Sequence, residues 1–217
     1  MICGVDEAGK GSVLGPMVVA GVGVASDGVF SDLDVRDSKA LPRKKREQLF
    51  RLIVERCSIA TVIVPADEID KRRTRISMNT CVARAHASVI RRLRPATAYV
   101  DACDVNPERY AHMVKEYLDE GLCEIVSEHH ADQTYKIVSA ASIVAKVVRD
   151  REVGLLARTY GTIGSGYPSD PLTIAFLSSY IKKHHAPPAC ARKSWKTIDN
   201  LIAAGEQSNL LSDPDTE

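Results

Sequence analysis

The chain has 217 residues, of which 45% are hydrophobic and 26% charged, and its formal net charge is +1. This composition is typical of a globular domain, and the absence of a run of about 18 apolar residues argues against a membrane span. The six cysteines are scattered without a Cys-x-x-Cys pair, which argues against a zinc site and predicts free thiols in a reducing compartment. No basic segment followed by an apolar one indicates export. We therefore expect a cytoplasmic protein.

The small net charge conceals a strongly basic segment. Residues 36–94 contain 16 Lys and Arg against 6 Asp and Glu, whereas the other 158 residues contain 13 basic and 22 acidic side chains. These basic residues could form solvated helix faces, or a basic surface beside an acidic site that would suit a bound polyanion. The charge distribution alone does not favour either interpretation over the other.

Strand and helix patterns alternate along the chain. We expect strands at residues 2–6, 13–24, 58–64, 96–100 and 123–127, and helices at 42–57, 66–71, 78–93, 107–119, 134–156 and from 171 onward. This alternation predicts an α/β domain with a mixed, partly parallel sheet. Open sheets of this kind carry their ligand sites at the C-terminal ends of strands.

The most informative segment is Gly4-Val5-Asp6-Glu7-Ala8-Gly9-Lys10-Gly11, at the end of the first predicted strand. It matches the G-x-x-x-x-G-K pattern of a phosphate-binding loop. Gly11, however, stands where that pattern needs a Ser or Thr hydroxyl, and two acids within the loop would repel phosphates. The segment that follows also has a strand pattern where a helix should begin. A P-loop nucleotide hydrolase is therefore a weak alternative.

Four acids stand at or just past the ends of predicted strands, namely Asp6, Glu7, Asp101 and Asp132. Residues at the ends of adjacent strands lie about 5 Å apart. Gathered carboxylates repel one another unless a divalent cation lies between them, and ligands that offer only oxygen favour Mg²⁺ or Mn²⁺ over zinc. Neighbours in a strand point to opposite faces, so Asp6 and Glu7 alone cannot form the whole site. Asp104 is better explained as a loop-end or capping aspartate.

The chain resembles ribonuclease HII, the type 2 ribonucleases H, in a collinear series of motifs. They are Gly4 to Gly11 with Gly15-Pro16, Asp37-Ser38-Lys39, Met78-Asn79, Tyr99-Val100-Asp101, His130-Ala131-Asp132, Ser139 to Asp150, Gly164 to Asp170 and Ser194-Trp195-Lys196-Thr197. The last two resemble the archaeal branch. The resemblance implies an RNase H-like fold with a central mixed five-stranded sheet flanked by helices, plus a C-terminal helical extension. We expect a catalytic domain over 1–160, a substrate-binding extension over 161–207 and a flexible tail over 208–217.

The resemblance also implies an activity. The family hydrolyses the RNA strand of RNA–DNA hybrids and cuts 5′ to single ribonucleotides in duplex DNA, leaving 3′-hydroxyl and 5′-phosphate ends. The implied catalytic and metal-binding residues are Asp6, Glu7, Asp101 and Asp132, which would hold two Mn²⁺ or Mg²⁺ ions. A non-catalytic module that binds hybrids is the alternative, but such a module would have no reason to keep four acids.

The substrate-binding residues implied by the resemblance are Gly9, Lys10, Gly11, Lys39, Asn79, Ser139, Lys146 and Tyr167. The glycine segment would sense a 2′-hydroxyl through its backbone, because glycine lets the main chain approach a sugar closely. The family usually has Arg where Lys10 stands, so affinity would fall if a guanidinium is needed there. Tyr167 would pack on the sugar next to the ribonucleotide. The alternative interpretation of Tyr167 is an aromatic loop residue that covers the start of a helix. For Lys146, an ordinary position on a helix surface explains the residue almost as well as a phosphate contact does.

The expected partners are RNA–DNA hybrids and DNA that contains ribonucleotides, bound by a monomer with no membrane contact. A sliding clamp stays open as a protein partner. The clamp-binding peptides that we would look for pair a glutamine with later aromatics, and the tail after Ser208 has none.

Overall fold

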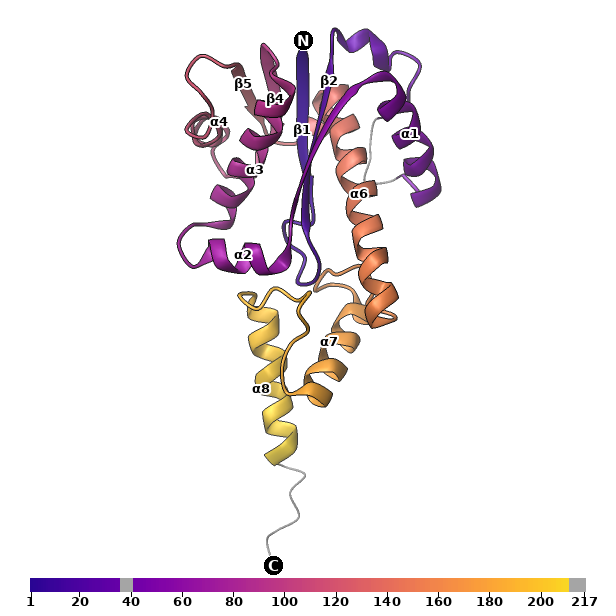
Figure 1. Ribbon diagram of the computed structural model, residues 1–217, viewed down its shortest axis with the longest axis vertical. Coiled ribbons are helices and arrows are strands. Elements are labelled where there is room, and N and C mark those ends of the chain that lie inside the picture. The colour runs from indigo at the N-terminus through magenta and orange to yellow at the C-terminus, as the bar shows by residue number, and fades with distance from the viewer. Residues whose placement is uncertain (36–40, 211–217) are drawn as a thin grey trace, which may run out of the picture. The chain divides into compact units, whose positions relative to one another are not determined.

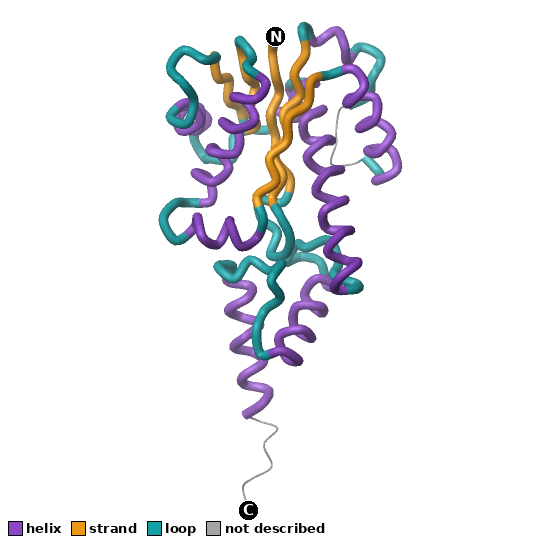
Figure 2. Tube along the Cα trace, viewed as in Figure 1, coloured by secondary structure: helices purple, strands orange, loops and turns teal. Residues whose placement is uncertain are grey.

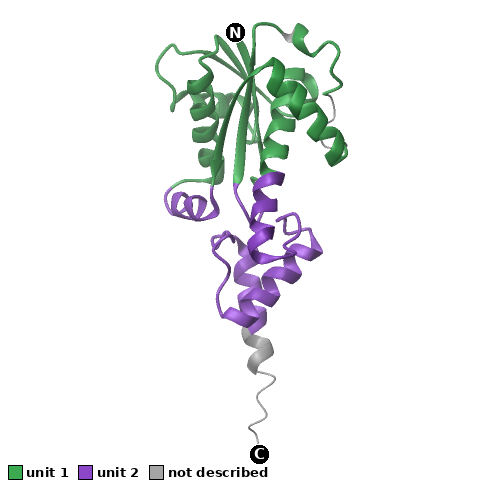
Figure 3. Ribbon diagram, turned by 45° about the vertical axis from the view of Figure 1, so that its right-hand side comes forward, with its two compact units in different colours: residues 1–10, 17–64, 76–149 green, residues 11–16, 65–75, 150–217 purple. Residues whose placement is uncertain are grey.

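The computed structural model describes residues 1–35 and 41–210 (Figure 1). The chain divides into two compact units, each made of several segments (Figure 3). Unit 1 comprises Met1–Lys10, Met17–Val64 and Ile76–Arg149, and unit 2 comprises Gly11–Pro16, Pro65–Arg75 and Asp150–Glu217, as far as these are described. The domain boundary expected at residue 160 stays a prediction, because the two units are a different division of the chain. Unit 2 also takes in two segments from the N-terminal half.

Unit 1 is built on a mixed five-stranded sheet in the order β3-β2-β1-β4-β5, and its strands are orange in Figure 2. Its strands are β1 (Ile2–Ala8), β2 (Met17–Val24), β3 (Ser58–Val64), β4 (Thr97–Asp101) and β5 (Glu124–Glu128). β2 is antiparallel to both β1 and β3, whereas β1, β4 and β5 run parallel to one another. The parallel strands therefore end at the same edge of the sheet. The predicted mixed five-stranded sheet is confirmed.

β2 begins at Met17 and not at residue 13, as the apolar pattern predicted. Gly15 has a φ of 79°, a left-handed conformation that interrupts an extended strand. Pro16 lacks the N–H that a strand ladder needs. Leu14 makes only an isolated bridge, with Ala191, so this apolar stretch belongs to a loop.

Helices cover both faces of the sheet in unit 1 (Figure 1). They are α1 (Arg43–Arg56), α3 (Met78–Leu93), α4 (Pro107–Lys115), α5 (Ala131–Thr134) and the first part of α6 (Lys136–Tyr160), with a short 3-10 helix at Asp27–Phe30. A methyl group at Gly4 would lie 2.4 Å from the Ile137 backbone in α6, and one at Gly21 would lie 2.3 Å from Val89 in α3. Gly21 pairs with Val5, so these two glycines face opposite sides of the sheet. The two helices therefore contact the strands directly, on opposite faces.

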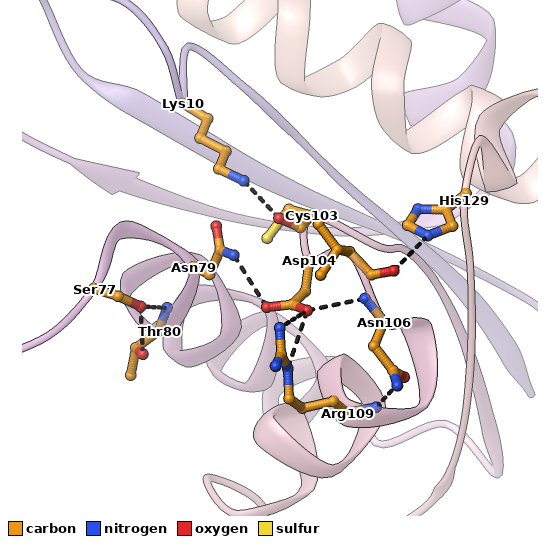
Figure 4. Close-up of polar contacts among 10 residues, drawn as sticks. Lys10, Ser77, Asn79, Thr80, Cys103, Asp104, Asn106, Arg109 and His129 are labelled. Carbon is orange, nitrogen blue, oxygen red and sulfur yellow. Dashed lines mark hydrogen bonds and ion pairs between the residues drawn. The ribbon is translucent and has the colours of Figure 1, made fainter.

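Capping side chains fix the starts of the two helices that flank β4 in sequence. Ser77 accepts a hydrogen bond at 3.1 Å from the Thr80 amide in α3, and Asn106 accepts one at 3.0 Å from the Arg109 amide in α4 (Figure 4). Pro107 occupies the start of α4, where its missing N–H costs nothing. These caps place the first turn of α3 and the loop before α4 in defined positions.

Unit 2 contains α2 (Ala66–Arg73), the second part of α6, α7 (Pro171–His184) and α8 (Lys196–Leu210). Its core includes Val13, Leu14, Ile163, Leu177 and Ile198. The Gly166 carbonyl accepts hydrogen bonds from the Val13 and Leu14 amides at 2.9 and 3.1 Å. The fully buried Arg192 donates from Nε to the Gly15 carbonyl at 3.1 Å. The expected helices after residue 161 are confirmed, and they share a core with the segment that follows Lys10.

In the described ranges, no helix has the length and apolar character that crossing a membrane requires. All six cysteines are free thiols, as predicted, and Cys3, Cys81 and Cys190 are buried. Burial raises the pKa of the Cys190 thiol to about 11, so this thiol stays protonated and unreactive at neutral pH.

Candidate active site

Asp6 and Glu7 lie within β1, which continues to Ala8, so their side chains point to opposite faces of the sheet. Asp6 lies on the α6 face, where it forms a hydrogen bond with Ser142 and is 6% exposed. Glu7 lies on the α3 face, with its Oε2 at 3.2 Å from His86 Nε2. This divergence agrees with the expectation that the pair alone does not form a site.

The pKa of the Asp6 carboxyl is raised well above its usual value by burial, and further by the charges of Glu7 and then Asp101. Hydrogen bonds from Ser142 and from the Glu7 amide, which lies 2.7 Å from Asp6 Oδ1, oppose this shift. Glu7 and Asp101 therefore lie close enough to Asp6 to influence its carboxyl group.

Asp101 ends β4 and pairs with Glu128 of β5. The Ala131 amide donates a hydrogen bond at 2.9 Å to Asp101 Oδ1. His130 lies between the end of β5 and the start of α5. It adopts a left-handed conformation, with a φ of 57°, that turns the chain from β5 into α5. The residue next to Asp132 is thus held against the end of β4, and Asp132 itself is buried. Its convergence with the other three acids stays a prediction.

The chemistry of these donors fits a divalent cation, because their carboxylate oxygens are the ligands that Mg²⁺ and Mn²⁺ prefer. A cation would also relieve the repulsion that Glu7 and Asp101 exert on the buried Asp6. Within residues 1–35 and 41–210, however, no three His, Cys, Asp or Glu side chains are gathered tightly enough to hold an ion. The carboxylates would have to draw closer when a cation binds.

The loop after β4 contacts two of the predicted substrate-binding residues (Figure 4). Lys10 donates from Nζ to the Cys103 carbonyl at 2.8 Å, and Asn79 donates from Nδ2 to Asp104 Oδ2 at 3.2 Å. The pKa of Asp104 is lowered by a hydrogen bond from the backbone amide two residues on, and by the Arg109 guanidinium. Asp104 therefore orders its own loop, which agrees with the interpretation of this residue as a loop-end aspartate.

Two predicted phosphate contacts in α6 have partners within the protein. Ser139 is fully buried and its hydroxyl donates to the Val35 carbonyl, which argues against contact with a phosphate. Lys146 donates from Nζ to Ser142 Oγ at 2.9 Å, and Ser142 in turn is bonded to Asp6. Lys146 is therefore connected to the acids through Ser142. Lys39 lies outside the described residues.

His86 was not identified from the sequence. It is fully buried in α3, and its Nδ1 lies 3.2 Å from the hydroxyl of Tyr110 in α4, which is also fully buried. The available signal was a single histidine at helical spacing among apolar residues, a pattern that core histidines share. His129 and His130, by contrast, are exposed residues in the turn after β5.

Gly11 and Tyr167 both belong to unit 2. Gly11 is exposed, and a Cβ there would meet no atom within 4 Å. Tyr167 is half-buried and follows Gly166, whose carbonyl holds the Val13 and Leu14 amides. The loop that carries Tyr167 is thereby tied to the short segment that begins at Gly11.

Comparison with known proteins identifies the family. Residues 3–198 match the model of the ribonuclease HII family. The ribonuclease HII of Methanoregula boonei is 63% identical over 212 residues, which cover 98% of this chain and 99% of that protein.

Two solved archaeal structures share the fold. The first, described as the PCNA:RNase HII complex from Archaeoglobus fulgidus, is 41% identical with a TM-score of 0.86 and covers 93% of this chain and 96% of that chain. The second, ribonuclease H2 from Pyrococcus horikoshii, is 38% identical with a TM-score of 0.87 and covers 95% of this chain and 99% of that chain. The predicted RNase H-like fold is confirmed. The chain belongs to the ribonuclease HII family, and it is an endoribonuclease that cleaves RNA in RNA–DNA hybrids.

Proposed function

We propose that this endoribonuclease also incises duplex DNA 5′ to single embedded ribonucleotides and leaves 3′-hydroxyl and 5′-phosphate ends. The proposal rests on the parallel pairing of β1 with β4 and of β4 with β5, which brings the ends of three strands to one edge of the sheet. Asp6, Glu7 and Asp101 belong to two of these strands, and the hydrogen bond from Ala131 to Asp101 ties the chain beside Asp132 to the same edge.

We further propose that the four acids hold two divalent cations, Mn²⁺ or Mg²⁺. When bound, these ions would activate a water and stabilise the leaving 3′-oxygen. The protein contributes the positions of the carboxylates. Asp6 is held by Ser142, to which Lys146 donates at 2.9 Å, and Glu7 is held by His86 on the other face.

Recognition of the 2′-hydroxyl is proposed for the backbone of residues 9–11. Gly9 has a φ of 83°, which a glycine adopts without strain. The contact between Lys10 Nζ and the Cys103 carbonyl supports this proposal, because it gives the lysine head a partner inside the protein. Lysine in place of the usual arginine would then cost little.

Gly11→Ala tests this role without disturbing the fold. A methyl group has room in the protein, because no atom lies within 4 Å of the Cβ position, so a loss of activity would come from contact with the substrate. We expect incision at a single ribonucleotide to fall about tenfold, or ~1.4 kcal/mol in the barrier, with an unchanged melting temperature. Gly205→Ala, which also adds an unopposed methyl, is the control. Full incision by Gly11→Ala would contradict the proposal.

Tyr167→Ala is expected to weaken incision at single ribonucleotides about tenfold more than cleavage of long hybrids, ~1.4 kcal/mol of selectivity. The proposed ring packs on a deoxyribose beside the ribonucleotide, and long hybrids have a ribose at that position. Tyr167→Phe keeps the ring and should keep the selectivity. Initial rates on both substrates give the ratio, and equal losses on the two would remove the proposed role.

The decisive experiment uses two duplexes of one sequence, one with a single ribonucleotide and the other with a full RNA strand. Each is incubated with Mg²⁺, Mn²⁺ or EDTA, and the ends are identified by their susceptibility to ligase and phosphatase. Incision 5′ to the ribonucleotide with a metal, and none in EDTA, is expected. Binding without cleavage would favour the hybrid-binding module instead.

A sliding clamp is a candidate partner, because the Archaeoglobus fulgidus relative was solved in a PCNA complex. The tail after Ser208 lies largely outside the described residues. Co-elution of the full chain with an archaeal clamp in size-exclusion chromatography would test the partnership.

A further inference from the structure

A buried polar pair, His86 and Tyr110, lies next to Glu7 on the α3 side of the sheet. Both side chains are fully buried, and their rings meet edge to face with centroids 5.7 Å apart. His86 Nε2 lies 3.2 Å from Glu7 Oε2, and His86 Nδ1 lies 3.2 Å from the Tyr110 hydroxyl. Both nitrogens of the ring therefore have a polar partner, as burial of an imidazole requires.

The direction of these hydrogen bonds follows from the carboxylate. An ionised Glu7 can only accept, so Nε2 of His86 must carry the proton that it donates. In a neutral imidazole the other nitrogen, Nδ1, then has a lone pair and accepts. The Tyr110 hydroxyl is the group that can donate to it. Glu7 thus selects the tautomer of His86, and Tyr110 provides the partner that Nδ1 needs in this tautomer.

The His86–Tyr110 pair is buried and therefore differs from the residues that would face a substrate. Glu7 is 11% exposed, whereas its partner His86 is 0% exposed, so the histidine reaches the site only through the carboxylate. His86 comes from α3 and Tyr110 from α4, and both helices belong to unit 1 together with Glu7. Two helices therefore combine to orient one acid on the face opposite to Asp6.

We propose that His86 is a positioning residue that holds Glu7 Oε2, so that the carboxylate is oriented for a divalent cation, with Tyr110 supplying the hydrogen bond that the other ring nitrogen of the histidine needs. The inference rests on the proposed function, because it takes Glu7 as a metal ligand. Partners of this kind affect metal affinity because a ligand held in place loses less freedom on binding, and their removal typically costs about 10- to 100-fold.

Two substitutions of His86 separate positioning from packing. His86→Gln places an amide nitrogen near the position of Nε2 and can still donate to Glu7. His86→Asn is shorter; its amide lies near the position of Nδ1 and reaches toward Tyr110 but not toward Glu7. Both variants introduce a neutral amide into the same cavity. His112→Asn, on the exposed side of α4, is the matched control.

The measurement is isothermal titration of the metal-free full chain with Mn²⁺, accompanied by thermal unfolding. We expect His86→Gln to bind Mn²⁺ within about threefold of the wild type and His86→Asn to bind it about 10- to 100-fold more weakly. In hybrid cleavage, His86→Asn should need correspondingly more Mn²⁺ for half-maximal rate, with an unchanged KM for the hybrid at saturating metal. Tyr110→Phe, which removes one hydroxyl, should weaken Mn²⁺ binding to an intermediate degree.

Equal Mn²⁺ affinity in the wild type, His86→Gln and His86→Asn would overturn the inference. Equal losses in the two variants, with unchanged melting temperatures, would also overturn it, because the effect would then not depend on a donor to Glu7. If His86→Asn does not fold, Tyr110→Phe decides, and unchanged affinity there would count against the inference. Failure of the proposed function is seen separately, since a wild-type chain that binds no Mn²⁺ would overturn the metal assignment itself.

Discussion

Asp6→Asn will abolish hybrid cleavage and at the same time raise the melting temperature of the metal-free protein. Asparagine keeps the shape of the side chain and an oxygen that accepts from Ser142 and from the Glu7 amide, but it removes a charge that Glu7 and Asp101 repel. We expect a cleavage loss of at least about 1000-fold, ~4 kcal/mol in the barrier. In EDTA the melting temperature should rise about 2–4 °C, the shift that ~1 kcal/mol produces in a chain of this size.

The gain in stability should depend on pH in a defined direction. The pKa of Asp6 is raised in the folded protein, so the protonated carboxyl favours folding below its unfolded value of about 3.9, and this contribution is lost as the pH rises through the folded pKa. The difference in melting temperature between Asp6→Asn and the wild type should therefore be small near pH 4 and widen toward neutral pH. Calorimetry in EDTA across this range measures it.

A neutral substitution elsewhere provides the control for this experiment. Asp119→Asn, at an exposed position, should change neither the melting temperature nor cleavage. Added Mn²⁺ should reverse the order of stability, because the wild type gains more from a bound cation than Asp6→Asn does. Asp6→Asn with wild-type activity would refute its place in the acid cluster, and lower stability than the wild type in EDTA at pH 7 would refute the repulsion.

Gly4→Ala will destabilise unit 1 severely. Its Cβ would lie 2.4 Å from the Ile137 backbone and 2.5 Å from the Val138 nitrogen, and backbone atoms cannot rotate away as a side chain can. Either β1 or α6 must shift, at a cost of about 1–3 kcal/mol or more. The shift would also separate Asp6 in β1 from Ser142 in α6, so cleavage should fall even at temperatures where the protein stays folded. Urea denaturation gives the free energy of unfolding.

Gly154→Ala, within α6, the helix that Gly4 packs against, is the matched control. A Cβ there meets no atom within 4 Å, and alanine is favoured over glycine in a helix by about 0.5–1 kcal/mol. The same chemical change should thus stabilise the protein at residue 154 and destabilise it at residue 4. A stability of Gly4→Ala equal to that of the wild type would show that α6 does not pack directly on β1.

The sheet could be predicted from the sequence, because short β-branched segments alternate with helical patterns. The start of β2 could not, because Val13 and Leu14 have the same apolar pattern whether they extend a strand or, as found, lie in the core of unit 2. Burial of Ser139 depends on Val35, far away in sequence, whose carbonyl its hydroxyl meets.

The residues that contact the acids, such as His86, could not be predicted from the sequence for a related reason. A histidine on the apolar face of α3 has the same spacing whether it is a packed core residue or a partner of Glu7. Only the pairing of β1 with β4, and the packing of α3 on that face, decide which carboxylate it meets. The apolar runs before Asp6, Glu7 and Asp101, by contrast, are local features of the sequence, which is why these acids could be chosen as candidates in advance.

The composition of unit 2 has a consequence for synthesis on the ribosome. Val13 and Leu14 emerge early, but the Gly166 carbonyl that holds their amides and the Arg192 side chain that holds Gly15 are made much later. The nascent chain must therefore keep these two apolar residues uncovered until nearly all of it has been translated, a period in which exposed apolar surface invites aggregation or chaperone binding. A chain ending at residue 160 would lack both Gly166 and Arg192 and would stay in that state permanently.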